Sequence, residues 1–351
     1  MRTHTISVLA GDGIGLEVMP VAMQVLDAAA EPHGVGFQWR EHPWGSDYYL
    51  AHGRMMPLDA IDQLAQTDAV FLGAVGSPEV SDTETLWGML IPIRREFDQY
   101  VNLRPIRSFS GIASSLAGSP EIDMVIVREN VEGEYSAVGG RSYRGTPYEA
   151  AYQQALFSRF GIERIARFAA EVAASRSGRL VSATKSNGII HTMPFWDEVV
   201  AEVVAEFDTV VLESVLIDAL AARMVRRPRS LDVIVASNLF GDILSDLAAG
   251  AVGSIGIAPS ANLDPERRHP SMFEPVHGSA PDIAGQGIAN PIGQIWAGAM
   301  MLDHLGHPDI ARRLEAAFTA VIESGLVTPD LGGTATTAEV GAAVIERLGS
   351  V

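Results

Sequence analysis

The sequence predicts an α/β protein in which helices cover both faces of a sheet. Short runs rich in β-branched residues alternate with helical patterns along most of the chain. Several predicted strands, such as DAVFLGAV and DVIVAS, are continuously apolar rather than alternating, as expected when both faces are covered. The chain has 351 residues, 47% of them hydrophobic, which is enough for two domains or one large one.

The predicted elements follow one another without a flexible linker or an internal repeat. We expect strands at residues 6–10, 68–75, 123–127, 179–185, 208–214 and 232–237, and helices at 15–31, near 81–98 and at 241–250. Residues 250–281 are rich in Gly, Pro, Asn and Ser, which predicts long ordered loops. Any domain boundary must therefore be crossed by ordinary ordered segments.

Composition excludes several classes of protein. The chain has no cysteine, so disulfides and thiolate chemistry are absent and a cytoplasmic location is expected. The N-terminal stretch does not have the apolar region of a signal peptide, and the longest strongly apolar segment, residues 292–302, is too short to span a bilayer. The formal net charge of −18 repels phosphate backbones. We therefore expect neither a nucleic acid nor a membrane as a partner.

Gly11, Gly13 and Gly15 follow the first predicted strand and open a helix, as in a dinucleotide-binding fingerprint. Leu16, however, stands where that fingerprint requires its third glycine. No clear acidic residue ends a second strand about 20 residues later. The stretch predicts a tight strand-to-helix turn and not a Rossmann site.

Basic residues gather in two segments of this acidic chain. IRREFDQYVNLRP contains Arg94 and Arg104, and VRENVEGEYS contains Arg128 and Tyr135. Planar guanidinium groups suit bidentate binding of carboxylates, so several of them converging on one site would hold a dicarboxylate. Each arginine alone could instead be a surface or salt-bridging residue. Lys185, just past a predicted strand, could be a solvated cap or, if partly desolvated, a general base.

Asp242 and Asp246 lie one helical turn apart in SNLFGDILSDLAAG, a segment without Lys or Arg. On spacing alone they could belong to a polar stripe that includes Ser245. The segment is otherwise apolar and predicts a largely buried helix, in which two like charges are costly unless a cation binds them. Oxygen ligands without Cys or paired His suit Mg²⁺ or Mn²⁺. Asp218, in VLIDALAARM, is a candidate third ligand.

The segment FEPVHGSAPDIAGQGIANP, residues 273–291, contains several glycines that let backbone approach a ligand closely. Asp282 could accept hydrogen bonds from a ribose 2′-hydroxyl and would repel a 2′-phosphate. As an isolated string, the segment could also be a structural loop.

Taken together and in this order, IRREFDQYVNLRP, VRENVEGEYS, ATKSNG, NLFGDILSD and EPVHGSAPDIAG resemble the motifs of the β-decarboxylating dehydrogenases, the isocitrate/isopropylmalate dehydrogenase family. The resemblance runs from the first strand to near the C-terminus and is greatest to the branch acting on tartrate and D-malate. It implies an isopropylmalate-dehydrogenase-like fold with a non-Rossmann cofactor site. Residues 1–99 and 253–351 would form a cofactor-binding domain, and residues 100–252 a substrate, metal and dimerisation domain sharing the same sheet. It also implies a homodimer whose active site is shared between subunits.

The resemblance further implies a role for each candidate residue. Three carboxylates would hold Mn²⁺ or Mg²⁺, namely Asp242, Asp246 and the neighbouring subunit's Asp218, and family members also use K⁺. The catalytic residues would be Tyr135 and Lys185, and the substrate would be bound by Arg94, Arg104 and Arg128. NAD would contact Glu274, His277, Gly278, Ser279, Ala280, Asp282 and Asn290. Ser245 has no role in this scheme and is expected to face solvent.

The implied reaction is the NAD- and divalent-metal-dependent oxidative decarboxylation of an (R)-2-hydroxy dicarboxylic acid, with D-malate going to pyruvate as the leading hypothesis. Tartrate, 3-isopropylmalate and other 3-substituted malates are alternatives within the class. Pro92 and Leu216 stand where relatives in the tartrate and D-malate branch carry basic or polar residues, which favours a third substituent less polar than tartrate's hydroxyl. Alternatives from other classes are a non-catalytic metabolite-binding relative and a metal-dependent hydrolase.

Overall fold

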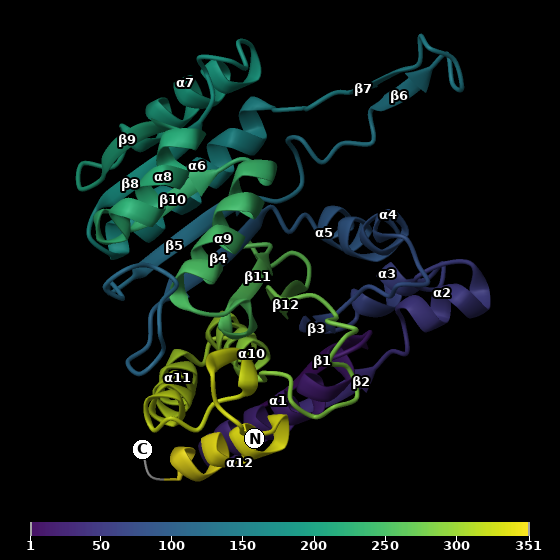
Figure 1. Ribbon diagram of the computed structural model, residues 1–351, viewed down its shortest axis with the longest axis vertical. Helices are drawn as coiled ribbons and strands as arrows, with labels where there is room; N and C mark the ends of the chain where they lie inside the picture. The colour runs from purple at the N-terminus through teal and green to yellow at the C-terminus, as the bar shows by residue number, and fades with distance from the viewer. Residues whose placement is uncertain (1, 350–351) are drawn as a thin grey trace.

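The computed structural model describes residues 2–349 and has a mixed α/β architecture built on one ten-stranded sheet, which confirms the predicted fold class (Figure 1). The strands lie in the order β2-β1-β3-β12-β11-β4-β5-β10-β8-β9. Their bounds are β1 Arg2–Gly11, β2 Val35–Glu41, β3 Ala69–Ala74, β4 Val101–Arg107, β5 Asp123–Glu129, β8 Arg179–Thr184, β9 Val211–Leu216, β10 Val233–Ala236, β11 Pro259–Leu263 and β12 Ser271–Pro275.

Helices cover the sheet, and α1, α4, α5 and α9 overlap the three ranges in which the sequence predicts helices. The α-helices are α1 Gly15–Ala30, α2 Ser46–His52, α3 Ala60–Leu64, α4 Asp82–Thr85, α5 Ile91–Glu96, α6 Arg159–Ser175, α7 Thr192–Val204, α8 Ile217–Arg226, α9 Asn238–Val252, α10 Ile292–His304, α11 Pro308–Glu323 and α12 Thr337–Leu348. A π-helical turn, η2 Leu86–Leu90, joins α4 to α5. Short 3₁₀ turns are η1 Glu31–His33, η3 Pro228–Ser230, η4 Ile255–Ile257 and η5 Pro329–Leu331.

The sheet has two parallel blocks that meet through antiparallel strands at its centre. Strands β2, β1, β3 and β12 are parallel to one another, as are β5, β10, β8 and β9. Between them, β11 pairs antiparallel with both β12 and β4, and β4 pairs antiparallel with β5. One sheet contains strands from both sides of the predicted domain boundaries at residues 99/100 and 252/253. The division into two domains therefore remains a prediction.

The expectation that residues 250–281 form long loops is wrong, because β11 and β12 are buried central strands within this range. The reason lies in their polar side chains. Ser260 and Asn262 of β11 are fully buried, and the Asn102 side-chain amide on β4 donates to both, at 2.8 and 2.9 Å. A strand stabilised by such a network has no apolar run from which it could be predicted.

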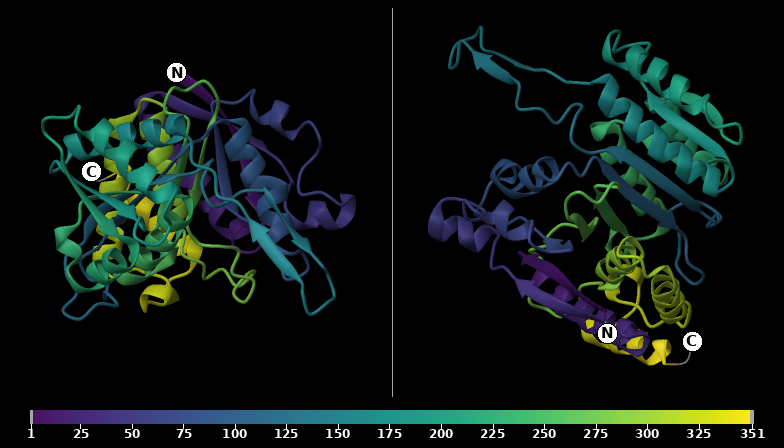
Figure 2. Two further views of the ribbon diagram at one scale, coloured as in Figure 1. Left: turned by 90° about the horizontal axis from the view of Figure 1, so that it is seen from above. Right: turned by 180° about the vertical axis from the view of Figure 1, so that it is seen from behind.

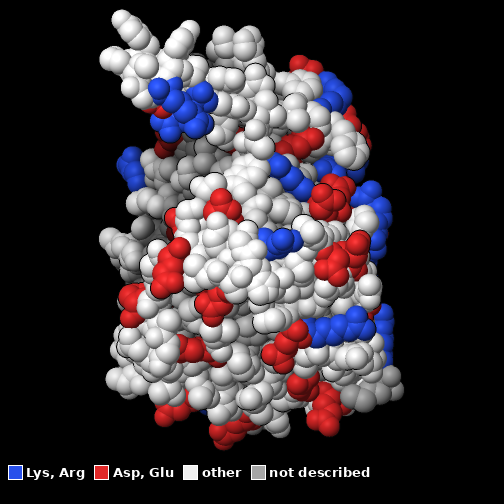
Figure 3. Space-filling model, turned by 90° about the vertical axis from the view of Figure 1, so that its right-hand side faces the viewer, with Lys and Arg blue, Asp and Glu red and all other residues white. Residues whose placement is uncertain are grey.

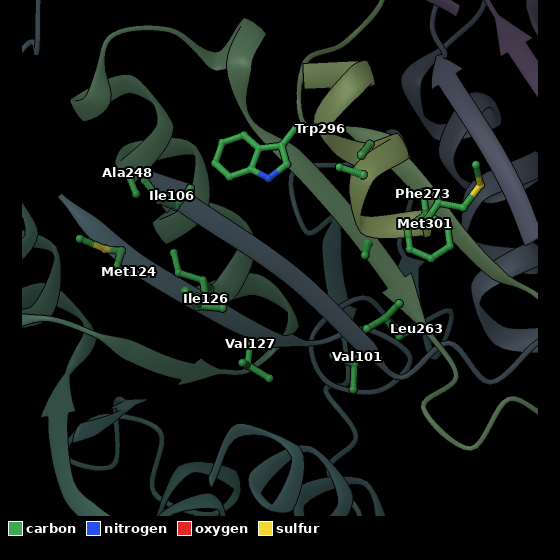
Figure 4. Close-up of a cluster of buried hydrophobic side chains, with 14 of the residues drawn as sticks. Val101, Ile106, Met124, Ile126, Val127, Ala248, Leu263, Phe273, Trp296 and Met301 are labelled. Atoms are coloured by element: carbon green, nitrogen blue, oxygen red, sulfur yellow. The ribbon is translucent and has the colours of Figure 1, made fainter. Parts of the chain in front are cut away.

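The hydrophobic core extends across the junction between the two blocks. Figure 4 shows Val101 and Ile106 of β4 near Ile126 and Val127 of β5, with Trp296 of α10 beside them. Helices α1, α10, α11 and α12 pack on one another over the first block, while α9 packs on β4, β5 and β10. The central strands that carry predicted site residues are therefore covered by α9 and α10.

A two-stranded arm extends away from the body of the molecule (Figures 1 and 2). It consists of β6 Gly139–Ser142 and β7 Ala150–Gln153, and every residue of these two strands is exposed. On the face shown in Figure 3, acidic and basic side chains are interspersed without a basic stripe. No helix within residues 2–349 is long and apolar enough to cross a membrane.

Candidate active site

A cavity of about 210 Å³ lies where both blocks of the sheet meet η2, α5 and α9. Its walls include eight residues predicted from the sequence: Arg94, Arg104, Arg128, Tyr135, Asp242, Glu274, His277 and Gly278. Predicted substrate, catalytic, metal and cofactor residues therefore meet in one place. The other predicted residues lie outside this lining: Lys185, Asp218, Asp246, Ser279, Ala280, Asp282 and Asn290.

Three arginines reach the cavity from α5, β4 and β5, and all of them are buried. Arg94 pairs with Glu274 at 2.8 Å between Nη2 and Oε1. The Nε and Nη2 groups of Arg128 donate to Asn238 Oδ1 at 3.1 and 2.7 Å, which fixes the guanidinium plane. Gly241 is needed opposite this side chain, because a Cβ there would come within 2.6 Å of the Arg128 Cβ.

Asp242 receives its counter-charges from strands and not from its own helix. Arg128 Nη1 forms a close ion pair with Oδ1, Arg104 Nη1 lies 3.6 Å from the same oxygen, and the Tyr135 hydroxyl donates to Oδ2 at 2.7 Å. Burial raises the pKa of the Asp242 carboxyl, but the two arginines and the Tyr135 hydrogen bond outweigh it, so the net pKa is lowered. The carboxylate is therefore ionised and can accept a hydrogen bond or bind a cation.

The second helical acid is less enclosed. Asp246 has a side chain 56% exposed and lies 3.3 Å from Arg104 Nη1, and burial together with the nearby Asp242 raises its pKa. Between the two acids, Ser245 is fully buried, accepts from Arg104 Nη1 at 2.5 Å and donates to the Asp242 carbonyl at 2.9 Å. The expectation that Ser245 faces solvent is therefore wrong, because this hydroxyl orients Arg104.

The Tyr135 phenol is positioned as a proton donor. It is half-buried, and burial together with its hydrogen bond to ionised Asp242 raises its pKa to about 12. The hydroxyl therefore keeps its proton at neutral pH. The Arg128 guanidinium lies 5.5 Å from the ring centroid and fixes the ring from one side.

Lys185 and Asp218 lie apart from the cavity but together. Lys185 follows β8, Asp218 opens α8, and Nζ lies 2.6 Å from Oδ1. The Asp218 side chain is 67% exposed, so the apolar run around it in the sequence does not bury it. Across residues 2–349, no three His, Cys, Asp or Glu side chains are close enough to hold a metal ion together. One chain thus does not assemble the three predicted metal ligands.

The turn at Gly11–Gly15 supports the predicted cofactor segment. Strand β1 ends at Gly11 and α1 begins at Gly15, as predicted. The Ile14 amide donates to the Ser279 carbonyl at 2.9 Å, and a Cβ on Gly13 would lie 2.1 Å from that oxygen. The glycine at position 13 is therefore required by the close approach of the 277–290 segment.

Within that segment, His277 is buried and its Nδ1 lies 3.0 Å from the Gly278 carbonyl, so Nδ1 carries the proton. Burial lowers the His277 pKa, and Nε2 is buried without a partner among residues 2–349. Asn290 donates to Asp330 at 3.0 Å, while Asp282 is exposed and Ala280 adopts a φ of 40°. An acceptor nitrogen and an exposed carboxylate thus lie on one loop beside the cavity.

Comparison with known proteins agrees with this geometry. The family model described as isocitrate/isopropylmalate dehydrogenase matches residues 5–344. A probable tartrate dehydrogenase/decarboxylase of Bacillus subtilis is 53% identical over 350 residues, covering 99% of both chains. The D-malate dehydrogenase [decarboxylating] of Escherichia coli is 52% identical over 354 residues, covering 98% of both. The crystal structure of isocitrate dehydrogenase from Methylococcus capsulatus superposes with a TM-score of 0.89 at 36% identity, over 98% of this chain and 99% of that one.

The chain belongs to the isocitrate/isopropylmalate dehydrogenase family. It is accordingly an oxidoreductase acting on a CH–OH group, and the names of its relatives support a decarboxylating hydroxy-acid dehydrogenase. Members of this family generally use NAD and a divalent metal ion, act on small hydroxy acids and form dimers.

For this family member, sequence reasoning missed several residues that shape the site. Leu90 lines the cavity beside Leu86 because the π-helical turn brings both of them to its wall. Asn238 orients Arg128, and Glu134 accepts hydrogen bonds from the first residues of α9. Asn238 stands inside the motif NLFGDILSD and Glu134 inside VRENVEGEYS, so their positions in these motifs were the available signal, whereas Leu90 lies outside the quoted motifs.

Proposed function

We propose that this protein catalyses the oxidative decarboxylation of an (R)-2-hydroxy dicarboxylic acid with NAD as acceptor, and that D-malate going to pyruvate, CO₂ and NADH is its reaction. The observation that carries the proposal is the convergence of three buried guanidinium groups, those of Arg94, Arg104 and Arg128, on one small cavity. In a chain of net charge −18, these three guanidinium groups outnumber the two carboxylates of the same lining, Asp242 and Glu274, and so favour a small anion.

The apolar part of the cavity supports a small or apolar third substituent. Leu86, Leu90, Val75 and Val276 contribute to its walls. A 3-hydroxyl placed against these side chains would lose its hydrogen bonds to water, at a cost of about 1–3 kcal/mol. That cost corresponds to roughly 5- to 150-fold in kcat/KM, since about 1.4 kcal/mol is tenfold. D-malate is favoured over tartrate on this ground, and small 3-alkylmalates follow.

The acids of α9 suit a divalent cation only when a further ligand is supplied. Asp242 and Asp246 offer hard oxygen donors from one helix face, as Mg²⁺ and Mn²⁺ prefer. Asp218 is exposed beside Lys185 on the same chain, where a second subunit could use it. We propose that Asp242 and Asp246 hold the cation together with Asp218 of the partner subunit. When bound, the cation would polarise the 2-hydroxyl and stabilise negative charge on that oxygen.

A homodimer with a shared site accounts for several exposed features. The arm formed by β6 and β7 projects from the body, and its region exposes Tyr143, Tyr148 and Tyr152. Ile190, a few residues after Lys185, and Ile243 on α9 are exposed large apolar side chains near predicted site residues. Exposed apolar surface of this kind is typical of a subunit interface.

Lys185 has a further property that supports its assignment as the base. It is the only lysine among the 25 Lys and Arg residues of the chain. A guanidinium cannot act as a base at neutral pH, whereas an amine can. A proton-accepting role for this amine would explain why position 185 is a lysine while the other Lys and Arg positions are arginine.

The proposed reaction follows from the chain's own groups. The arginines hold the two carboxylates, and Lys185 of the partner subunit takes the proton of the 2-hydroxyl while hydride leaves C2 for the nicotinamide. The C3–carboxylate bond then breaks, CO₂ leaves, and its electron pair forms the enolate of pyruvate. Tyr135, which holds its proton at neutral pH, delivers it to C3. His277 Nε2 is available to accept a hydrogen bond from the cofactor, and the Asp282 carboxylate favours NAD over NADP.

The test is NADH formation, followed by absorbance with Mn²⁺ and K⁺ present, across D-malate, L-malate, the tartrates, 3-isopropylmalate and isocitrate. We expect D-malate to give the highest kcat/KM, with the tartrates at least about fivefold lower, given the hydroxyl cost above. Chelator should abolish the activity. If a tartrate gave a much higher kcat/KM than D-malate, tartrate would replace D-malate as the proposed substrate. No NADH formation with any of these acids would contradict the proposed function.

A further inference from the structure

We infer that Glu134 is a positioning residue, whose carboxylate fastens the segment carrying Tyr135 to the N-terminus of α9, the helix that carries Asp242. The inference rests on the proposed function, which makes Tyr135 the proton donor. Glu134 Oε1 accepts from the Ser237 hydroxyl at 2.7 Å, and Oε2 accepts from the Leu239 amide at 3.1 Å. The next residue along the chain is Tyr135.

The carboxylate of Glu134 takes the place of an ordinary helix cap. Ser237 is the N-cap residue of α9, yet its side chain does not cap the helix and donates to Glu134 instead. Glu134 thus satisfies an amide at the helix N-terminus from outside the helix. The position also places a negative charge where the helix dipole favours it.

The loop and the helix meet at three successive levels. Asn238 Nδ2 donates to the Glu132 carbonyl at 3.1 Å, and a Cβ on Gly133 would lie 3.3 Å from the Asn238 Cβ. Glu134 makes the middle tie, and the Tyr135 hydroxyl makes the last, to Asp242 Oδ2 at 2.7 Å. On the α9 side, the Glu134 side chain therefore holds the backbone that presents Tyr135 to Asp242, while Arg95 Nη2 donates to the Tyr135 carbonyl at 2.6 Å from the α5 side.

A purely structural role must be separated from positioning, because Glu132 makes a similar arrangement elsewhere. Its carboxylate accepts from the Ser158 amide and hydroxyl, at 2.9 and 2.7 Å, and Ser158 is the N-cap of α6. Helix α6 carries none of the predicted site residues. A loss of stability alone would therefore not distinguish the two roles, and the readout must report on the step that Tyr135 performs.

The first arm of the experiment compares Glu134→Ala and Glu134→Gln with Glu339→Gln, which weakens the capping box of α12 away from the site. Pre-steady-state NADH formation is followed with D-malate and with D-malate deuterated at C2. We expect Glu134→Ala to form the first NADH at close to the wild-type rate and then to turn over roughly 10- to 100-fold more slowly, the size of effect of a misplaced catalytic group. The deuterium effect on kcat should disappear, because a step after hydride transfer has become limiting.

Glu134→Gln provides the rescue, because its amide keeps an acceptor for the Leu239 amide and a donor for the Ser237 hydroxyl. We expect it to recover most of the lost turnover, and Glu339→Gln to leave both the burst and the isotope effect unchanged. A Glu134→Ala enzyme with wild-type turnover and isotope effect would overturn the inference, as would a Gln variant as slow as the Ala variant.

The second arm is independent of activity. Hydrogen–deuterium exchange by mass spectrometry should show faster exchange in both residues 133–136 and 238–241 of Glu134→Ala, and no such change in Glu339→Gln. Unchanged exchange in the two segments would also overturn the inference. If the wild-type protein oxidised none of the acids, the proposed function would fail, while this arm would still decide whether Glu134 ties the two segments.

Discussion

Replacing Glu129 by Gln should remove a pH dependence from the stability of the protein. The Glu129 side chain is buried at the end of β5, where it accepts from the Val131 and Glu132 amides. Burial raises its pKa to about 7 from an ordinary value of 4.5, against the opposing effect of those hydrogen bonds. Because the pKa is higher in the folded state, this group's contribution to stability is full below about pH 4.5 and is lost as pH rises towards 7.

The size of this effect follows from the pKa shift. Between pH 5.5 and 7 the unfolded carboxyl is ionised while the folded one holds its proton, so stability falls by about 1.4 kcal/mol per pH unit, or about 2 kcal/mol over this interval. Urea unfolding of the wild-type and Glu129→Gln proteins at pH 5.5 and pH 8 measures it. We expect the variant to gain about 2 kcal/mol relative to wild type between the two pH values.

A control separates this effect from a general loss of structure. Glu339 on α12 is fully exposed, and its hydrogen bonds to Thr336 lower its pKa, so it is ionised at both pH values. Any loss in Glu339→Gln should therefore be the same at pH 5.5 and 8. The reasoning about Glu129 would be refuted by a difference between its variant and wild type that is equally independent of pH.

Two further substitutions test the site. Arg128→Lys keeps a cation for Asp242 but loses the Nε and Nη2 bonds to Asn238. We expect the free energy of unfolding, measured with urea, to fall by about 1–3 kcal/mol and KM for D-malate to rise roughly tenfold or more. A KM within twofold of wild type would contradict substrate binding by this residue. Gly13→Ala places a methyl group against the Ser279 carbonyl and should abolish the rise in Tm on adding NAD, whereas Gly34→Ala, which also has a positive φ but nothing within 4 Å of the added Cβ, should lose stability and keep that rise. An equal NAD response in the two glycine variants would contradict the role given to the turn.

The fold class was predictable because β1, β3, β5, β8, β9 and β10 overlap predicted strands, whereas among the helices of residues 2–349 only α1, α4, α5 and α9 overlap predicted helical ranges. The α/β class and the tight turn at Gly11–Gly15 follow from local patterns that the tertiary structure does not override. Strand β11 was missed because Ser260 and Asn262 are satisfied by Asn102, a partner over 150 residues away. Pairing of that kind depends on tertiary contacts and leaves no trace in a sequence window.

The same distinction applies to the site. The absence of Lys or Arg near Asp242 correctly indicated an unusual acid, but its cations lie on β4 and β5 and could not be located from spacing. Ser245 was misjudged because the i+3 position on a helix does not show which strand lies opposite; Arg104 makes it a buried acceptor. Lys185 and Asp218 lie outside the lining of the cavity, and the proposed second chain that completes the site would account for this separation.

The central claim, an active site shared between two subunits, is tested most directly by complementation. Asp218→Asn and Asp242→Asn chains are each expected to form inactive homodimers. Coexpressed with different tags, they should form heterodimers in which one site combines the intact Asp242 of one chain with the intact Asp218 of the other. A random mixture should then recover about a quarter of the wild-type NADH formation with D-malate. Heterodimers detected by native mass spectrometry without recovered activity would contradict the shared site.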